Sequence, residues 1–245
     1  MEDDLKAQEQ IKAKDQTVLR AVHIEREFVT GNTTLKALKG VDLSIDAGQL
    51  VALKGRSGSG KTTLLNIMGG LDQPTSGQMF FQQQEISALP ERERTLLRRA
   101  QYGFIFQSFA LMPLLSAEEN VELSLRMAGV ERRFWSDRVA ECLDFVGLTG
   151  RKKHRPFELS GGEQQRVAIA RAIAHKPTLI LADEPTAELD TRMGFQVMQL
   201  FRELVESEGI TICMTTHDPA IMEVVDRVYA MVDGKLIEEA VKKEE

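Results

Sequence analysis

The sequence predicts an α/β fold: a sandwich around a parallel sheet, with a helical subdomain inserted over about 107–158. Continuous apolar runs at 178–182 and 211–215 are typical of parallel strands that are buried on both faces. Helical patterns separate these runs, and strand alternating with helix is the mark of an α/β domain. The middle of the chain differs, because three helical patterns follow one another there with little strand between them.

The first predicted elements are strands. Residues 41–45 alternate strictly between apolar and polar side chains, as a half-buried strand does. A turn at 46–48 leads into a short apolar strand at 50–54, and a helix is predicted over 61–68. The chain therefore passes from a buried strand through a short loop into a helix.

Three helices are predicted in the middle of the chain, over 90–100, 117–127 and 134–146. Residues 116–119 (Ser-Ala-Glu-Glu) have the spacing of a capping box at the start of the second helix. Gly147 is a suitable C-terminal cap for the third helix. The last two helices make up the predicted helical subdomain.

The second half of the chain returns to the α/β pattern, with helices predicted over 163–174 and 193–208. One globular domain is therefore expected over 18–240. A polar tail over 1–17 precedes it, and a charged tail over 241–245 follows it. We assign no function to either tail.

The composition narrows the class of protein. The 245 residues are 42% hydrophobic, enough for one large domain with a subdomain. The net charge is -6 and no basic stripe stands out, which argues against a nucleic-acid binder. No apolar run approaches the roughly 18 residues of a membrane span, and the N-terminus lacks the apolar segment of a secretory signal. We expect a soluble protein with reduced, buried cysteines (Cys142 and Cys213), whose membrane role, if any, depends on a partner.

Residues 55–62, GRSGSGKT, fit the pattern G-x-x-x-x-G-K-[ST] between a predicted strand and a predicted helix, the setting of a phosphate-binding loop. The glycines let backbone N–H groups face phosphate oxygens, and the helix adds the positive end of its dipole. Lys61 can reach the β- and γ-phosphates, and Thr62 can ligate Mg²⁺. The alternative, an accidental glycine-rich turn, has a chance of about one in a hundred. The predicted nucleotide ligands here are Gly55, Ser57, Gly58, Ser59, Gly60, Lys61, Thr62 and Thr63.

Two adjacent acids, Asp183 and Glu184, end the predicted strand at 178–182. Ligands bind at the carboxyl edge of a parallel sheet, where these side chains are expected. Asp183 can hold the shell of a Mg²⁺ ion, and Glu184 can polarise an attacking water. Taken alone, paired acids after a strand are more often turn or helix-cap residues. The phosphate-binding loop upstream favours the catalytic interpretation.

Residues 159–166, LSGGEQQR, resemble the signature sequence of ATP-binding-cassette (ABC) ATPases. The resemblance implies a P-loop NTPase core with a parallel sheet, an N-terminal antiparallel β part and an inserted helical subdomain. It also implies a homodimer that holds two ATP molecules between its chains. In that dimer the signature residues of one chain contact the γ-phosphate that the other chain binds; they are Ser160, Gly161, Gly162 and Glu163. The same Ser–Glu spacing is a capping box, and both interpretations are compatible.

Other family positions follow in the expected order. Gln107 matches the glutamine loop, which senses Mg²⁺ and the membrane partner, and His217 matches the switch histidine near the γ-phosphate. The resemblance implies that both are catalytic residues and that Gln107 is also a metal ligand. Phe28 aligns with the aromatic residue that stacks on adenine. By position alone, His217 could be a capping or packing residue and Phe28 a core residue. Residues 187–190 match the dimer-contact loop but differ at its first two positions, which leaves Glu188 without an assigned role.

Residues 69–77, 102–107 and 181–186 look like the macrolide-efflux and lipoprotein-release type of cassette. That resemblance implies an ATPase that energises separate integral membrane permease subunits from the cytoplasmic face of the membrane, to which it binds peripherally. One alternative is a soluble cassette ATPase that acts on nucleic acid or ribosomes, but such proteins usually carry two cassettes and more positive charge. A P-loop kinase is a further alternative, and it would explain neither the signature nor the paired acids.

Overall fold

The computed structural model describes residues 16–241, except for the side chains of 219–220 and 238–241. The predicted tails at 1–17 and 241–245 lie outside this range apart from residues 16, 17 and 241. Among the described residues, no helix combines the length and the apolar character that crossing a bilayer demands.

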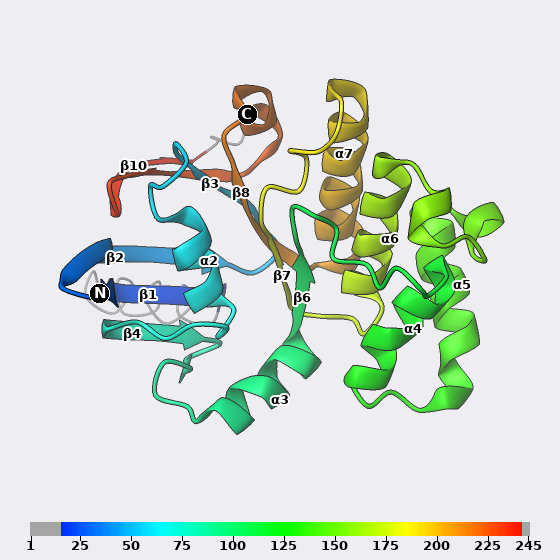
Figure 1. The fold of residues 1–245 in the computed structure, drawn as a ribbon, viewed down its shortest axis with the longest axis horizontal. Coiled ribbons are helices and arrows are strands. Elements are labelled where there is room, and N and C mark those ends of the chain that lie inside the picture. Colours follow the sequence, from blue (N-terminus) through cyan, green and yellow to red (C-terminus); the bar gives the residue numbers. More distant parts are fainter. Residues whose placement is uncertain (1–15, 242–245) are drawn as a thin grey trace, which may run out of the picture.

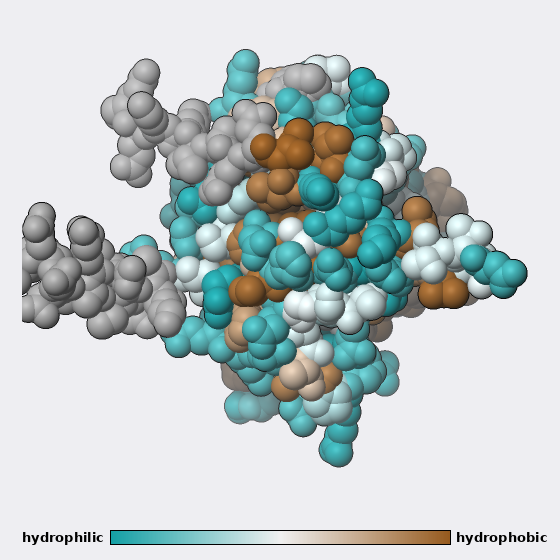
Figure 2. All heavy atoms as spheres, turned by 90° about the vertical axis from the view of Figure 1, so that its left-hand side faces the viewer, coloured by the Kyte–Doolittle hydropathy of each residue, from teal (hydrophilic) through white to brown (hydrophobic). Residues whose placement is uncertain are grey.

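A four-stranded antiparallel sheet forms one side of the molecule, with the strand order β2–β1–β4–β5 (Figure 1). Its strands are β1 (Thr17–Thr30), β2 (Thr33–Asp46), β4 (Ser76–Phe81) and β5 (Gln84–Glu85). The strand predicted at 41–45 is the buried end of β2. Figure 2 shows that the face on this side is mostly hydrophilic, with its largest apolar cluster in the upper part and smaller apolar patches elsewhere.

A six-stranded sheet forms the centre, in the order β10–β9–β3–β8–β7–β6. Its strands are β3 (Leu50–Lys54), β6 (Tyr102–Ile105), β7 (Leu179–Ala182), β8 (Thr211–Thr216), β9 (Arg227–Val232) and β10 (Lys235–Val241). Only β10 runs antiparallel to its neighbour. The predicted strands at 50–54, 178–182 and 211–215 are therefore confirmed within a residue, and β6 separates two of the predicted middle helices.

Helices flank the central sheet. They are α2 (Lys61–Met68), α3 (Glu91–Gln101), α4 (Ala117–Met127), α5 (Trp135–Phe145), α6 (Gly161–Ile173) and α7 (Thr191–Glu208), with short 3₁₀ turns η1 (Arg132–Phe134), η2 (Thr149–Arg151), η3 (Pro156–Glu158) and η4 (Pro219–Val224). Both predicted capping boxes are present, at the first residues of α4 and α6. Gly147 adopts the left-handed conformation, with φ +70°, just after α5.

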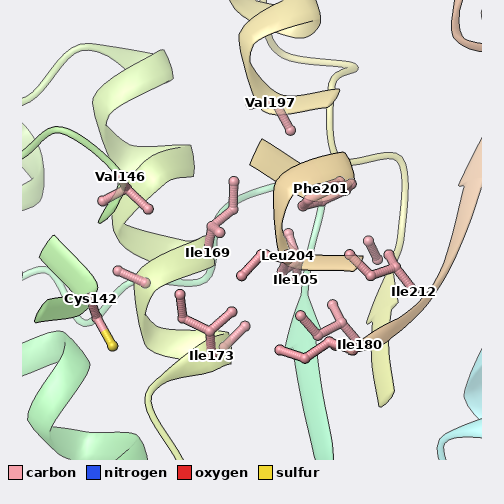
Figure 3. Close-up of a cluster of buried hydrophobic side chains, with 14 of the residues drawn as sticks. Ile105, Cys142, Val146, Ile169, Ile173, Ile180, Val197, Phe201, Leu204 and Ile212 are labelled. Carbon is pink, nitrogen blue, oxygen red and sulfur yellow. The ribbon is translucent and has the colours of Figure 1, made fainter. Parts of the chain in front are cut away.

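The central sheet separates two hydrophobic cores, because successive strand residues face opposite sides. In β3, Val51 and Leu53 pack with α2 and the antiparallel sheet, whereas Leu50 and Ala52 face the helical side. Figure 3 shows the helical side, where isoleucines of β6, β7 and β8 meet α6 and α7. This layered α/β architecture is the predicted fold class. α6 lies outside the predicted subdomain range 107–158 but packs against α4 and α5. This packing does not separate the subdomain from the rest of the domain, so the range stays a prediction.

Candidate active site

The phosphate-binding loop connects β3 to α2 at the carboxyl end of β3. A Cβ at Gly55 would come within 2.5 Å of the Met231 carbonyl oxygen and of Ser59 Oγ, so only glycine fits this close approach. Gly60 has φ +102°, a conformation that other residues rarely adopt. The local backbone therefore requires the glycines of the motif.

Lys61 is the first residue of α2, and its side chain is only 5% exposed. Its Nζ donates hydrogen bonds to the carbonyl oxygens of Gly55 at 2.8 Å and Arg56 at 3.2 Å. The same ammonium lies 3.9 Å from Glu184 Oε1. The loop and the carboxyl end of β7 thus face each other across a charged pair.

Asp183 lies next to the start of α2. Its Oδ1 accepts hydrogen bonds from Thr62 Oγ1 at 3.1 Å and from Thr215 Oγ1 at 2.6 Å. A carboxylate and a hydroxyl are hard oxygen donors, and Mg²⁺ takes one or two such protein ligands beside phosphate and water. Thr62 and Asp183 therefore fit the predicted magnesium site. The sequence interpretation missed Thr215, although a hydroxyl ending a buried apolar run was a signal.

Glu184 lies between Lys61 and His217. Its Oε2 is 3.4 Å from His217 Nδ1, and the histidine side chain is 64% exposed. The backbone of Glu184 is in the left-handed region, with φ +45°, which is uncommon for a residue with a side chain. The structure therefore brings the predicted water-activating carboxylate and the predicted switch histidine together.

A cleft of about 370 Å³ runs over the phosphate-binding loop. Its lining includes Phe28, Leu35, Lys36, Ala37, Lys39, Ser57, Gly58, Gly60, Lys61, Thr62, Thr63, Glu184, Asp233 and Gly234. A second cleft of about 300 Å³ adjoins it and includes Glu184 and His217. A wider depression of about 760 Å³ lies over α7, but glutamates 203, 206 and 223 line it, so it does not suit a triphosphate.

Phe28 is one of the residues that line the first cleft. The residue is 38% exposed, which does not fit the alternative of a core residue. The Arg26 guanidinium covers one face, 4.5 Å from the ring centre. Asp72 holds that guanidinium through two hydrogen bonds of 2.9 Å. One face of the ring is therefore supported by a fixed cation.

Two predicted groups lie elsewhere in the same chain. Gln107 directs its amide to Glu188, donating to Oε1 at 3.3 Å. The structure describes all four signature residues, 160–163, and none of them lines the cleft. Figure 1 shows α2 and α6 on opposite sides of β6 and β7. At the start of α6, the Ser160 N–H donates to the Glu163 carboxylate at 2.8 Å and lowers the pKa of that group.

The family model described as ABC transporter matches residues 38–187. The chain is 43% identical over 222 residues to the lipoprotein-releasing system ATP-binding protein LolD 1 of Rhodospirillum rubrum, covering 91% of this chain and 98% of that protein. It is 44% identical over 218 residues to the macrolide export ATP-binding/permease protein MacB of Rhodopirellula baltica, covering 88% of this chain but only 32% of MacB.

A solved structure of MJ0796 from Methanocaldococcus jannaschii, a dimeric post-hydrolysis state bound to ADP and Pi, superposes with a TM-score of 0.86. Its sequence is 40% identical, and the match covers 92% of this chain and 99% of that one. These relatives confirm the predicted resemblance to macrolide-efflux and lipoprotein-release cassettes. They give no support to a cassette that acts on nucleic acid or ribosomes. The chain belongs to the ABC transporter family, as an ATP-binding and ATP-hydrolysing cassette.

Proposed function

We propose that two copies of this chain enclose two ATP molecules and drive separate integral membrane permease subunits. One observation carries the proposal: the chain places the phosphate loop and Glu184 around one cleft, with Asp183 hydrogen-bonded to Thr62 there, while its own signature residues do not line that cleft. A second copy is then needed to supply residues 160–163 to the γ-phosphate. The dimeric MJ0796 structure supports this arrangement.

The described side chains divide the work of hydrolysis. Backbone N–H groups of residues 57–63 and the Lys61 ammonium bind the β- and γ-phosphates. Thr62 and Asp183, together with Gln107 once its amide leaves Glu188, would hold Mg²⁺. When bound there, the ion would supply positive charge against the charge that develops on the phosphate oxygens.

Glu184 polarises the water that attacks the γ-phosphorus. The bond to the β–γ bridging oxygen then breaks, which leaves ADP and phosphate. His217, 3.4 Å from the Glu184 carboxylate, orients that carboxylate and lies beside the γ-phosphate. Phe28 stacks on the adenine ring at the other end of the cleft.

Glu184→Gln tests this assignment. The variant keeps the shape of the side chain and the binding of MgATP, but it loses most turnover because an amide polarises water poorly. With hydrolysis blocked, the ATP-bound dimer accumulates and is visible by size-exclusion chromatography. Lys61→Ala is the contrasting variant: it loses nucleotide affinity and forms no such dimer. Wild-type turnover in Glu184→Gln would remove Glu184 from the mechanism.

The segment after Gln107 supports the proposed membrane partner. Its large side chains Met112 and Leu114 are 48% and 79% exposed, and Phe106, just before Gln107, is 38% exposed. Asn120, buried in α4, fixes this loop: its Oδ1 accepts from the Met112 N–H at 2.8 Å, and its amide donates to carbonyl oxygens of the loop. A surface on which exposed apolar side chains gather is typical of an interaction site. We propose that the helical subdomain over 107–158 docks a permease here, with the chain held peripherally at the cytoplasmic face of the membrane.

Leu114→Gln tests the docking. The variant keeps its fold and its basal hydrolysis but loses the membrane subunits that copurify with the wild-type chain. Leu96→Gln is the matched control, because Leu96 is 56% exposed on α3, a different part of the surface. Undiminished copurification of Leu114→Gln, or loss of fold in that variant, contradicts the docking role.

A further inference from the structure

Thr215 is a fully buried residue near the end of β8, and its hydroxyl joins the two acids of the active site. Thr215 Oγ1 accepts the backbone N–H of Glu184 at 2.9 Å. The same oxygen donates its proton to Asp183 Oδ1 at 2.6 Å. A hydroxyl has one donor and two acceptor sites, so both hydrogen bonds form at once.

The Thr215 hydroxyl serves as a hydrogen-bond acceptor at the point where the pairing of β7 with β8 ends. The last register pair between β7 and β8 is Ala182 with Met214. Beyond it the chain turns at Glu184, which has φ +45°, and the Glu184 N–H donates to a side chain, Thr215 Oγ1. Thr215 supplies the missing acceptor through its side chain. An apolar residue of the same shape would leave that N–H without this acceptor.

The hydroxyl also fixes the carboxylate that faces the phosphate loop. Asp183 Oδ1 is shared between Thr62 and Thr215. Thr62 is exposed to the cleft, whereas Thr215 is buried behind the carboxylate. Groups that hold a metal-binding carboxylate from behind set its orientation, and their loss typically costs about 10- to 100-fold in metal affinity or activity.

We propose that Thr215 is a positioning residue, which holds Asp183 and Glu184 in their working geometry through one hydroxyl. The proposal rests on the roles given above to these two carboxylates. It predicts that the hydroxyl, and not the volume of the side chain, matters at this position.

Three variants separate the effect of the Thr215 hydroxyl from the general effect of a substitution in β8. Thr215→Val removes the hydroxyl and keeps the branched shape, and Thr215→Ser keeps the hydroxyl. Thr211→Val is the matched control at the other end of β8: Thr211 is 1% exposed, and its hydroxyl accepts the Gly48 N–H at 3.0 Å. Both valine variants therefore lose a hydroxyl that accepts a backbone N–H, but only one of these hydroxyls contacts the active-site acids.

Two quantities are measured. The first is the rate of ATP turnover. The second, measured in the absence of turnover, is the Mg²⁺ concentration that half-saturates binding of a fluorescent ATP analogue. Thr215→Val is expected to lower turnover, and to raise that Mg²⁺ concentration, by about tenfold or more. Thr215→Ser and Thr211→Val stay near wild type in both. If circular dichroism shows that Thr215→Val is unfolded, Thr215→Ala takes its place with the same expectation.

Two results overturn the proposal: a folded Thr215→Val near wild type in both readouts, or a folded Thr215→Ser that falls as far as the valine variant. Glu184→Gln in the same experiment separates this outcome from failure of the proposed function. An active Glu184→Gln refutes the role of Glu184, and the Mg²⁺ readout still judges Thr215 through Asp183. An inactive Glu184→Gln beside a normal Thr215→Val refutes Thr215 alone.

Discussion

Phe28→Ala is expected to weaken ATP binding without slowing the chemical step. Arg26 already covers one face of the ring, so a purine gains one stacking contact from the other face. Stacking on one aromatic face contributes about 1–3 kcal/mol, which corresponds to a rise of roughly 5- to 150-fold in KM for ATP. Because hydrolysis takes place at the far end of the nucleotide, the contact is equal in the ground and transition states, and kcat stays nearly constant.

Steady-state hydrolysis and equilibrium binding of a fluorescent ATP analogue measure the two effects separately. Phe80→Ala is the matched control, because the Arg20 guanidinium lies 4.2 Å over the Phe80 ring on the same sheet but outside the cleft. Phe28→Tyr stays close to wild type. GTP replaces ATP with little loss, since stacking reads the face of the base.

Two results refute the stacking argument. Normal ATP binding by Phe28→Ala places the adenine platform elsewhere. A fall in kcat at constant KM shows instead that the substitution disturbs the active site through the antiparallel sheet. In that case Phe80→Ala shows whether the loss of an aromatic ring from β4 of the same sheet also lowers kcat.

Two further predictions concern stability. Burial lowers the pKa of His175 below its ordinary value of 6.5, so below about pH 6.5 the unfolded chain binds a proton that the native chain does not. The free energy of unfolding therefore falls as the pH drops through 6.5 and levels off below the pKa of His175 in the folded chain. His175→Gln should reduce the difference between the free energies of unfolding that urea titrations give at pH 7 and pH 5. An unchanged difference contradicts the assignment to His175. Ser116→Ala removes the acceptor of the Glu119 N–H and should cost about 1 kcal/mol in urea unfolding, with Ser116→Thr as the control that retains the cap.

Local patterns predicted the elements whose ends carry their own signals. The helices at 61–68 and 117–127 have the predicted bounds, because a glycine-rich loop and a capping box mark where they begin. The hairpin of β1 and β2 was predicted only over 41–45. Residues 33–36 are exposed, so apolar and polar side chains have no reason to alternate there.

Local patterns likewise predicted some contacts of the active site and not others. The proximity of Lys61 to Glu184 and of Thr62 to Asp183 followed from two short motifs and from the rule that parallel strands end at one edge. The contact between Thr215 and Asp183 spans 32 positions, and that between Gln107 and Glu188 spans 81. Such pairings depend on strand order and loop path, which no local pattern contains. The hydrogen bond from the Gln107 amide to Glu188 was for that reason not predicted.

The place of β3 in the sheet determines when a newly made chain acquires its phosphate-binding loop. β3 ends at residue 54, but both strands that flank it, β8 and β9, begin after residue 210. At synthesis rates of about 5–20 residues per second, the ribosome takes roughly 8–30 s to cover the interval. During that time the apolar β3 has unpaired backbone on both edges, which makes it a target for chaperones and for aggregation. The nascent chain therefore gains its nucleotide site only at the end of translation, after the signature and both acids have been made.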